Sequence, residues 1–170
     1  MEKWTADLTT RTGVKVHVRP VRREDEAGLT EFFSHVTKED LSFRYHAGIA
    51  KVGPERVAAL INVDHAQTEN YMAFGENGEP LIAIATLAYD AAFERAEVAI
   101  TIREDFKNQG ISWELLHYLA DVAAARGCKA IESIERRENR AAIELERNMG
   151  FVAEPDPDDS TVMIVRKELG

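Results

Sequence analysis

The chain has 170 residues, of which 45% are hydrophobic and 30% are charged, a composition typical of one globular domain with a buried core. Its formal net charge of −9 argues against nucleic acid or an anionic membrane as the main partner and favours cationic amines or lysine-bearing proteins. The polar segment from Met1 to Gly13 lacks the apolar stretch of a signal peptide, and no apolar run is long enough to span a membrane, so we expect a cytoplasmic protein.

The spacing of apolar residues predicts the elements in chain order. Residues 1–13 show no clear periodicity, and we expect an N-terminal extension there, either a tail or a short added element, before a domain covering 14–170. Val14, Val16 and Val18 alternate with polar residues in a first strand that Pro20 ends. Three helices (24–35, from about 37, and 54–61) and three strands (71–75, 81–89 and 94–102) are expected next. A helix (110–126), a strand (130–135), a helix (139–149) and two strands (151–154 and 161–167) complete the order.

The segment from Val98 to Arg126 changes from a strand pattern to a short polar turn and then to an amphipathic helix. The turn reads Lys107-Asn-Gln-Gly-Ile-Ser112. The first turn of a helix carries unpaired backbone N–H groups and a positive potential, and both attract phosphate. Lys107 adds a positive charge, and Gly110 lets a ligand approach the backbone. We therefore place the active site at this turn.

Two common anion-binding motifs do not fit this turn, because it has neither the Gly-x-x-x-x-Gly-Lys of a Walker loop nor the three glycines of a dinucleotide fingerprint. It resembles instead the acetyl-coenzyme A signature of the GNAT N-acetyltransferases, (Gln/Arg)-x-x-Gly-x-(Gly/Ala). Lys107 stands at the first position, Gly110 fits, and Ser112 replaces the final small residue. A second segment, 139–151, resembles the family's Asn-x-x-Ala-x-x-Leu-(Tyr)-x-x-x-Gly-Phe. The resemblance spans about Val14 to Glu168.

The resemblance implies a mixed α+β (α/β) GNAT fold, with a central, mostly antiparallel twisted sheet of about seven strands flanked by about four to five helices. It implies that the sheet is splayed where acetyl-CoA binds, and that backbone groups of the strand hold the thioester arm while the turn amides hold the pyrophosphate. The residues expected to contact acetyl-CoA are Ile100, Thr101, Ile102, Lys107, Asn108, Gln109, Gly110, Ile111, Ser112 and Asn139. No metal is expected, because the five histidines show no paired spacing and there is one cysteine.

Glu97 is the candidate general base. It begins the strand that leads into the turn, and Ala96-Glu-Val-Ala99 resembles the Ala-Glu-Phe-Ala of Pat-type protein lysine acetyltransferases, in which this glutamate accepts the proton of the amine. Without that resemblance, a glutamate on a half-buried strand is usually an exposed carboxylate. Both interpretations stay open at the level of sequence.

The segment from Val36 to His46 resembles Leu-Ser-x-Glu-(Ser/Asp)-x-Tyr-x-Arg-Phe of the Pat-type enzymes, although its apolar residues are also compatible with ordinary helix packing. His46 is a weak candidate for the acceptor site. Glu146 stands where many GNAT enzymes have a tyrosine that acts as general acid, and a carboxyl group can take that role only if its pKa is strongly raised.

These patterns predict an acetyl-CoA-dependent N-acetyltransferase that acts on an amine, foremost a protein lysine. Two alternatives stay open: the same chemistry on a small amine, and a non-catalytic module that senses acyl-CoA. A homodimer is also an open expectation.

Overall fold

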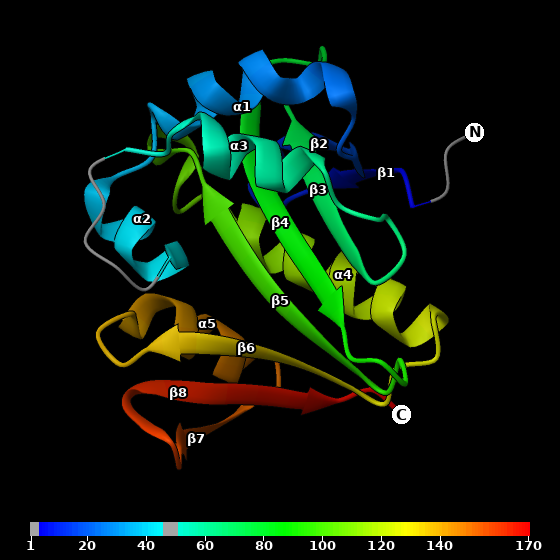
Figure 1. The fold of residues 1–170 in the computed structure, drawn as a ribbon, viewed down its shortest axis with the longest axis vertical. Coiled ribbons are helices and arrows are strands. Elements are labelled where there is room, and N and C mark those ends of the chain that lie inside the picture. Colours follow the sequence, from blue (N-terminus) through cyan, green and yellow to red (C-terminus); the bar gives the residue numbers. More distant parts are fainter. Residues whose placement is uncertain (1–3, 46–50) are drawn as a thin grey trace.

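The computed structural model describes residues 4–45 and 51–170, which form eight strands and five α-helices (Figure 1). The strands are β1 (Ala6–Thr9), β2 (Lys15–Pro20), β3 (Thr68–Phe74), β4 (Leu81–Tyr89), β5 (Arg95–Ile102), β6 (Ala130–Arg136), β7 (Val152–Asp156) and β8 (Asp159–Glu168). The α-helices are α1 (Glu26–Phe33), α2 (Lys38–Tyr45), α3 (Pro54–Ile61), α4 (Ile111–Ala125) and α5 (Arg140–Asn148). Short 3-10 turns cover Arg23–Asp25 and Glu104–Phe106.

All eight strands belong to one sheet with the order β1-β2-β3-β4-β5-β6-β8-β7. Every neighbouring pair is antiparallel except β5 and β6, which are parallel. A parallel pair needs a crossover connection, and α4 supplies it by carrying the chain from the end of β5 back to the start of β6. The one parallel pair among the described residues therefore flanks the predicted ligand turn.

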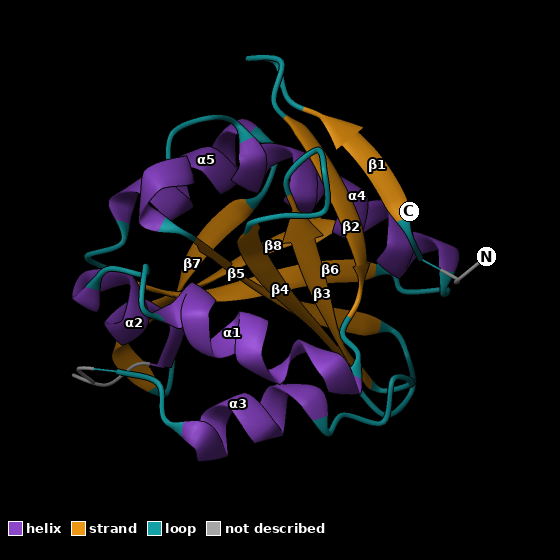
Figure 2. Cartoon of the chain, turned by 90° about the horizontal axis from the view of Figure 1, so that it is seen from above, coloured by secondary structure: helices purple, strands orange, loops and turns teal. Residues whose placement is uncertain are grey.

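Helices α1 and α3 cover one face of the sheet, and α4 covers the other (Figure 2). Because side chains alternate along a strand, successive residues of β3 and β4 point to opposite faces of the sheet and pack against the helices on both faces. Met72 and Ile84 pack against α1 and α3, while Tyr71 and Ala85 join the cluster that includes Leu115 of α4. The sheet is thus buried on both sides at β3 and β4, and β5 packs against the α4 side through Val98 and Ile102.

The expected fold class is confirmed: the sheet is mixed but mostly antiparallel, and helices flank it. The sheet has eight strands where about seven were expected, because β1 adds an edge strand to β2 with the register Ala6↔Val18 to Thr9↔Lys15. This strand lies inside residues 1–13. It is short and only half buried, so its sequence carries little periodic signal.

The expected splay is present between β5 and β6. The two strands pair only at Arg95↔Ala130, Ala96↔Ile131 and Glu97↔Glu132, although β5 continues to Ile102 and β6 to Arg136. From Val98 onward β5 keeps its partner β4 on one edge and has no strand on the other. The gap opens one residue after Glu97 and faces the start of α4.

Candidate active site

The turn before α4 presents a row of free backbone amides. Asn108 and Gly110 have left-handed backbone conformations, with φ of 63° and 82°, and Gly110 is the N-cap of α4. The first helical amide with an acceptor is that of Glu114, which donates to the Gly110 carbonyl at 3.2 Å. Within the described part of the chain, the N–H groups of residues 108–113 have no hydrogen-bond acceptor. Six consecutive unpaired amides at a helix N-terminus form a cradle for a phosphate group.

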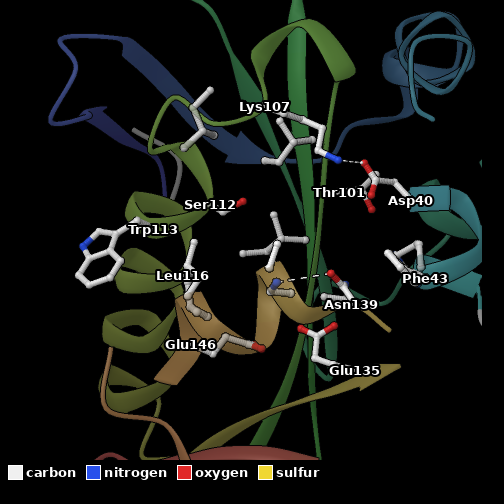
Figure 3. A pocket seen from close by; sticks show the side chains of 18 of the residues that line it. Asp40, Phe43, Thr101, Lys107, Ser112, Trp113, Leu116, Glu135, Asn139 and Glu146 are labelled. Atoms are coloured by element: carbon white, nitrogen blue, oxygen red, sulfur yellow. Dashed lines mark hydrogen bonds and ion pairs between the residues drawn. The ribbon is translucent and has the colours of Figure 1, made fainter. Parts of the chain in front are cut away.

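The β1–β2 turn and α2 hold this cradle from two sides. The Thr12 hydroxyl donates to the Gln109 carbonyl at 2.9 Å, and Thr10 lies so close to Gly110 that a Cβ there would meet the Thr10 Cβ at 3.4 Å. On the other side, Lys107 Nζ lies 2.7 Å from Asp40 Oδ2 of α2 (Figure 3). The sequence predicted a free Lys107, and the structure shows instead an ammonium already paired with a carboxylate.

The splay supplies a second set of unpaired backbone groups. The amide of Arg103 donates to Ile82 and the amide of Asp90 donates to the Arg95 carbonyl, so odd-numbered β5 residues bond to β4. By alternation, the N–H and C=O groups of Ile100 and Ile102 point into the gap left by β6. The backbone groups of Ile100 and Ile102 therefore face this gap. Thr101 differs: its backbone faces β4, and it presents to the cavity a buried hydroxyl that has no partner among the described residues.

A cavity of about 300 Å³ connects the turn with the splay. Figure 3 shows its labelled side chains, which come from α2, β5, the turn, α4, β6 and α5. Of the predicted cofactor contacts, all but Gln109 line it: Ile100, Thr101, Ile102, Lys107, Asn108, Gly110, Ile111, Ser112 and Asn139. Asn139 also caps α5, because its Oδ1 accepts from the Ala142 amide at 3.4 Å. Gln109 belongs to the same turn and contributes its amide. Apolar side chains such as Leu116 and Ile134 fill much of the remaining wall.

Two glutamate side chains, from α5 and β6, line this cavity, and a buried serine bonds to one of them. Glu146 of α5 is 4% exposed, and the hydroxyl of Ser133 on β6 donates to its Oε2 at 2.5 Å. The carboxyl group of Glu135, also on β6, lies within hydrogen-bonding contact of Glu146. Burial, followed by the nearby Glu135, raises the pKa of Glu146 to about 9, against a smaller opposing effect of Ser133. Burial also raises the pKa of Glu135.

Glu97 lies outside that cavity, on the exposed side of β5. It lines a second cavity of about 500 Å³ together with Arg44 and Arg136, and with Asp156 and Asp159 of the β7–β8 hairpin. Four residues line both cavities: Arg44, Val98, Ala99 and Ile134. The Glu97 carboxylate therefore lies next to the splay, on the opposite face of the sheet from Glu135 and Glu146.

Arg44 is fixed between the two cavities by a chain of hydrogen bonds. Its guanidinium donates to Thr86 of β4 at 2.9 Å, the Thr86 hydroxyl donates to Asn70 at 2.5 Å, and the Asn70 amide donates to the Leu60 carbonyl at 2.7 Å. Burial lowers the pKa of Arg44, and the nearby Tyr45 and Glu97 raise it. Arg44 is thus a positive charge, fixed in position, that interacts electrostatically with Glu97.

Several features of this site are absent from the sequence interpretation: the Lys107–Asp40 ion pair, the Arg44 chain and the Ser133–Glu135–Glu146 group. The sequence did contain a signal for the Ser133–Glu135–Glu146 group. Glu146 lies three residues after Ile143, so helical spacing places it on the buried face of α5. Cys128 is buried, and His46, the weak candidate for the acceptor site, lies outside the described residues. Over residues 4–45 and 51–170 there is no cluster of three metal-binding side chains. No helix in these same ranges is long and apolar enough to cross a membrane.

The chain resembles known acetyltransferases in sequence and in fold. Residues 32–151 match the Acetyltransferase (GNAT) family. The chain is 31% identical over 170 residues to Acetyltransferase PA5475 of Pseudomonas aeruginosa, an alignment that covers 99% of this chain and 90% of that protein.

Two solved structures illustrate the likeness in fold. The GNAT domain of S. lividans PAT has a TM-score of 0.88 at 23% identity and covers 98% of this chain and 97% of its own. Spermidine N-acetyltransferase from Vibrio cholerae, in complex with CoA and spermine, has a TM-score of 0.74 at 16% identity and covers 91% of this chain and 95% of its own.

Proposed function

This chain belongs to the GNAT family of N-acetyltransferases, and we propose that it transfers the acetyl group of acetyl-CoA to the side-chain amine of protein lysines, with Glu97 as the general base. The observation that carries the proposal is the row of six unpaired amides at residues 108–113, which opens into the splay between β5 and β6. Such a cradle suits a diphosphate, and the splay offers backbone partners for an extended arm that carries amides.

Acetyl-CoA fits the groups that the site leaves unpaired. When bound, it supplies an acetyl carbon activated as a thioester. The amides of residues 109–112 would hold its diphosphate, while the free backbone groups of Ile100 and Ile102 would take the place of a missing strand. Asn139 and the Thr101 hydroxyl offer further polar contacts from the cavity wall.

Glu97 is placed to receive a proton from the acceptor amine. An unperturbed lysine has a pKa near 10.4, so only on the order of one in a thousand is neutral at pH 7 and able to attack a carbonyl. The Glu97 carboxylate borders the splay through Val98 and Ala99, which line both cavities. It accepts the proton directly or through one water as the nitrogen attacks.

The second cavity supports an amine as acceptor. Glu97, Asp156 and Asp159 give it three carboxylates beside the two guanidinium groups of Arg44 and Arg136. Glu97 and Asp159 are exposed, so a lysine on another protein can approach them. The resemblance of residues 36–45 to Pat-type enzymes and the likeness to the GNAT domain of S. lividans PAT support lysine as that amine.

A small amine is the second candidate acceptor. The same carboxylates would attract a polyamine, and the likeness to a spermidine N-acetyltransferase supports this alternative. A screen that compares lysine peptides with spermidine and other small amines separates the two. Lysine peptides should give the higher kcat/KM.

The decisive experiment follows release of free thiol from acetyl-CoA in the presence of each acceptor, with Glu97→Gln as the test variant. Its matched control is Glu94→Gln, because Glu94 is an exposed glutamate immediately before the same strand and lines neither cavity. We expect Glu97→Gln to lower kcat by about 10²-fold to 10³-fold at pH 7, with the loss shrinking as rising pH deprotonates the amine. Equal rates for Glu97→Gln and wild type across pH 6 to 9 would exclude Glu97 as the base.

The same experiment separates catalysis from sensing. A non-catalytic acyl-CoA-binding module would bind acetyl-CoA in calorimetry and release no thiol with any acceptor. We further propose that the protein works in the cytoplasm and forms a homodimer, which localisation of the tagged protein and sedimentation velocity test.

A further inference from the structure

Arg44 of α2 stands where the two cavities meet, because it lines both of them together with Val98, Ala99 and Ile134. The first cavity is assigned to the thioester and the second to the acceptor amine. Residues that line both therefore surround the place where the amine nitrogen reaches the acetyl carbon. Of these four residues, Arg44 is the one with a polar side chain.

The strand register places the Arg44 guanidinium beside the start of the splay. The guanidinium donates to Thr86, and Thr86 lies opposite Ala99 in the β4–β5 pair. Because side chains alternate along a strand, Ala99 points to the same face of β5 as Glu97. The pairing of β5 with β6 ends at Glu97, so Ala99 belongs to the part of β5 that lacks a neighbour on that edge.

Most of the Arg44 guanidinium has no hydrogen-bond partner in the protein. An arginine side chain carries five N–H donors. Within residues 4–45 and 51–170, the bond to Thr86 is the only hydrogen bond or ion pair that this guanidinium makes. The side chain is half-buried, and burial lowers its pKa. The cation has thus lost part of its water without gaining a carboxylate, which leaves donors at the cavities for an oxygen of the reactants.

The bond to Thr86 also fixes these donors in place. The Thr86 hydroxyl accepts from Arg44 and donates to Asn70, which is 4% exposed and donates in turn to the Leu60 carbonyl. A donor that is already in position when charge develops stabilises a transition state without a cost of reorganisation. The chain therefore prepares Arg44 for such a role before the reactants arrive.

We propose that Arg44 is a further catalytic residue, which donates a hydrogen bond to the oxygen of the acetyl carbonyl and stabilises the negative charge that develops there, while Thr86 is its positioning residue. The inference rests on the proposed function, since it assumes that the acetyl group lies where the two cavities meet. The same positive charge disfavours the ammonium form of the incoming amine and so favours the neutral form, which is the form that attacks.

Arg44 keeps all of its protons through the reaction. The amine nitrogen bonds to the acetyl carbon, and the π pair of the carbonyl moves onto the oxygen, which accepts from Arg44. Glu97 takes the extra proton of the nitrogen. The pair on oxygen then restores the C=O bond as the carbon–sulfur bond breaks, and the electrons of that bond leave on sulfur. The resulting thiolate takes a proton from water, and Glu97 returns its proton to the solvent, which leaves an amide and a free thiol.

The first test measures polarisation of the carbonyl without turnover. The probe is acetyl-CoA labelled with ¹³C at the carbonyl, bound in the absence of an acceptor and observed by infrared difference spectroscopy. Its carbonyl stretch should lie at a lower frequency on the wild type than on Arg44→Met, because a charged donor draws electrons toward the oxygen. Equal frequencies on the two proteins would overturn the proposal.

The matched control is Arg56→Met. Arg56 is exposed and lines neither cavity, yet its guanidinium carbon lies 4.5 Å from the centroid of the same Tyr45 ring that Arg44 contacts at 5.1 Å. It therefore removes a similar cation and a similar ring contact. Arg56→Met should give the infrared frequency and the kcat of the wild type.

The second test separates catalysis from binding and from folding. Arg44→Met should lower kcat by about 10²-fold to 10³-fold, with an unchanged Kd for coenzyme A, which lacks the acetyl group. Arg44→Lys keeps the charge and should lose less. Thr86→Val removes the anchor but keeps the shape of the side chain, so it should lower kcat by about tenfold and move the infrared band part of the way toward that of Arg44→Met. If Arg44→Met does not fold, the Thr86→Val band decides: a band at the wild-type frequency would overturn the proposal.

The outcomes separate the two claims. An active wild type together with an Arg44→Met variant of equal kcat, or a loss confined to the KM for the amine, would overturn the catalytic role of Arg44 and leave the proposed function standing. A wild type that releases no thiol with any acceptor would overturn the proposed function, and the role of Arg44 with it, before any variant is compared.

Discussion

The substitution Glu146→Gln should make the stability of the protein less sensitive to pH. In the unfolded chain a glutamate ionises near pH 4.5, whereas the folded protein keeps the Glu146 proton up to about pH 9. Between these values folding takes up a proton, so the contribution of Glu146 is fully present below about pH 4.5 and is lost as the pH rises toward 9. Each pH unit in this window costs about 1.4 kcal/mol of folding free energy.

Urea unfolding at pH 5 and pH 8 measures this effect. Glutamine has no proton to lose, so the free energy of unfolding of Glu146→Gln relative to wild type should rise by on the order of 4 kcal/mol between the two pH values. Titrating groups that do not interact with Glu146 are common to both proteins and cancel in the difference. Glu144→Gln should show no such trend. A difference between Glu146→Gln and wild type that stays constant with pH would refute the idea of a neutral Glu146.

Two predictions concern the cradle. Gly110→Ala should weaken coenzyme A binding about tenfold, as measured by calorimetry. Alanine in a backbone conformation with φ of 82° costs about 1–2 kcal/mol, and its Cβ would press on Thr10. Unchanged affinity would show that coenzyme A binding does not depend on the conformation of this turn. Asp40→Asn should tighten coenzyme A binding roughly threefold to tenfold at low salt. The substitution removes a negative charge and frees the Lys107 ammonium to bind phosphate. Weaker binding would mean that the ion pair is needed to hold the turn in its binding conformation.

The sequence predicted those parts of the site that depend on local pattern. The strand that ends at Ile102, the turn with Gly110 and the helix that begins at Ile111 all lie within one stretch, and their order fixes the position of the turn. The helix from 110 to 126 was accordingly placed within a residue of α4 at each end. The splay followed from the family resemblance, and the strand register confirms it.

The remaining parts depend on contacts between distant segments. Lys107 and Asp40 are 67 residues apart, and neither the turn nor α2 indicates that they meet. Glu146 and Glu135 approach because α5 packs beside β6, so the raised pKa of Glu146 arises from burial that only the fold creates. Strand β1 was left undecided because four half-buried residues carry too weak an alternation.

The central claim is that the free amides before α4 bind the diphosphate of coenzyme A, and amide NMR of the ¹⁵N-labelled protein tests it most directly. On titration with coenzyme A, the resonances of residues 108–113 should move downfield, as expected for N–H groups that gain charged acceptors, and pantetheine without the diphosphate should leave them unmoved. Saturation with coenzyme A while these resonances keep their positions would contradict the claim.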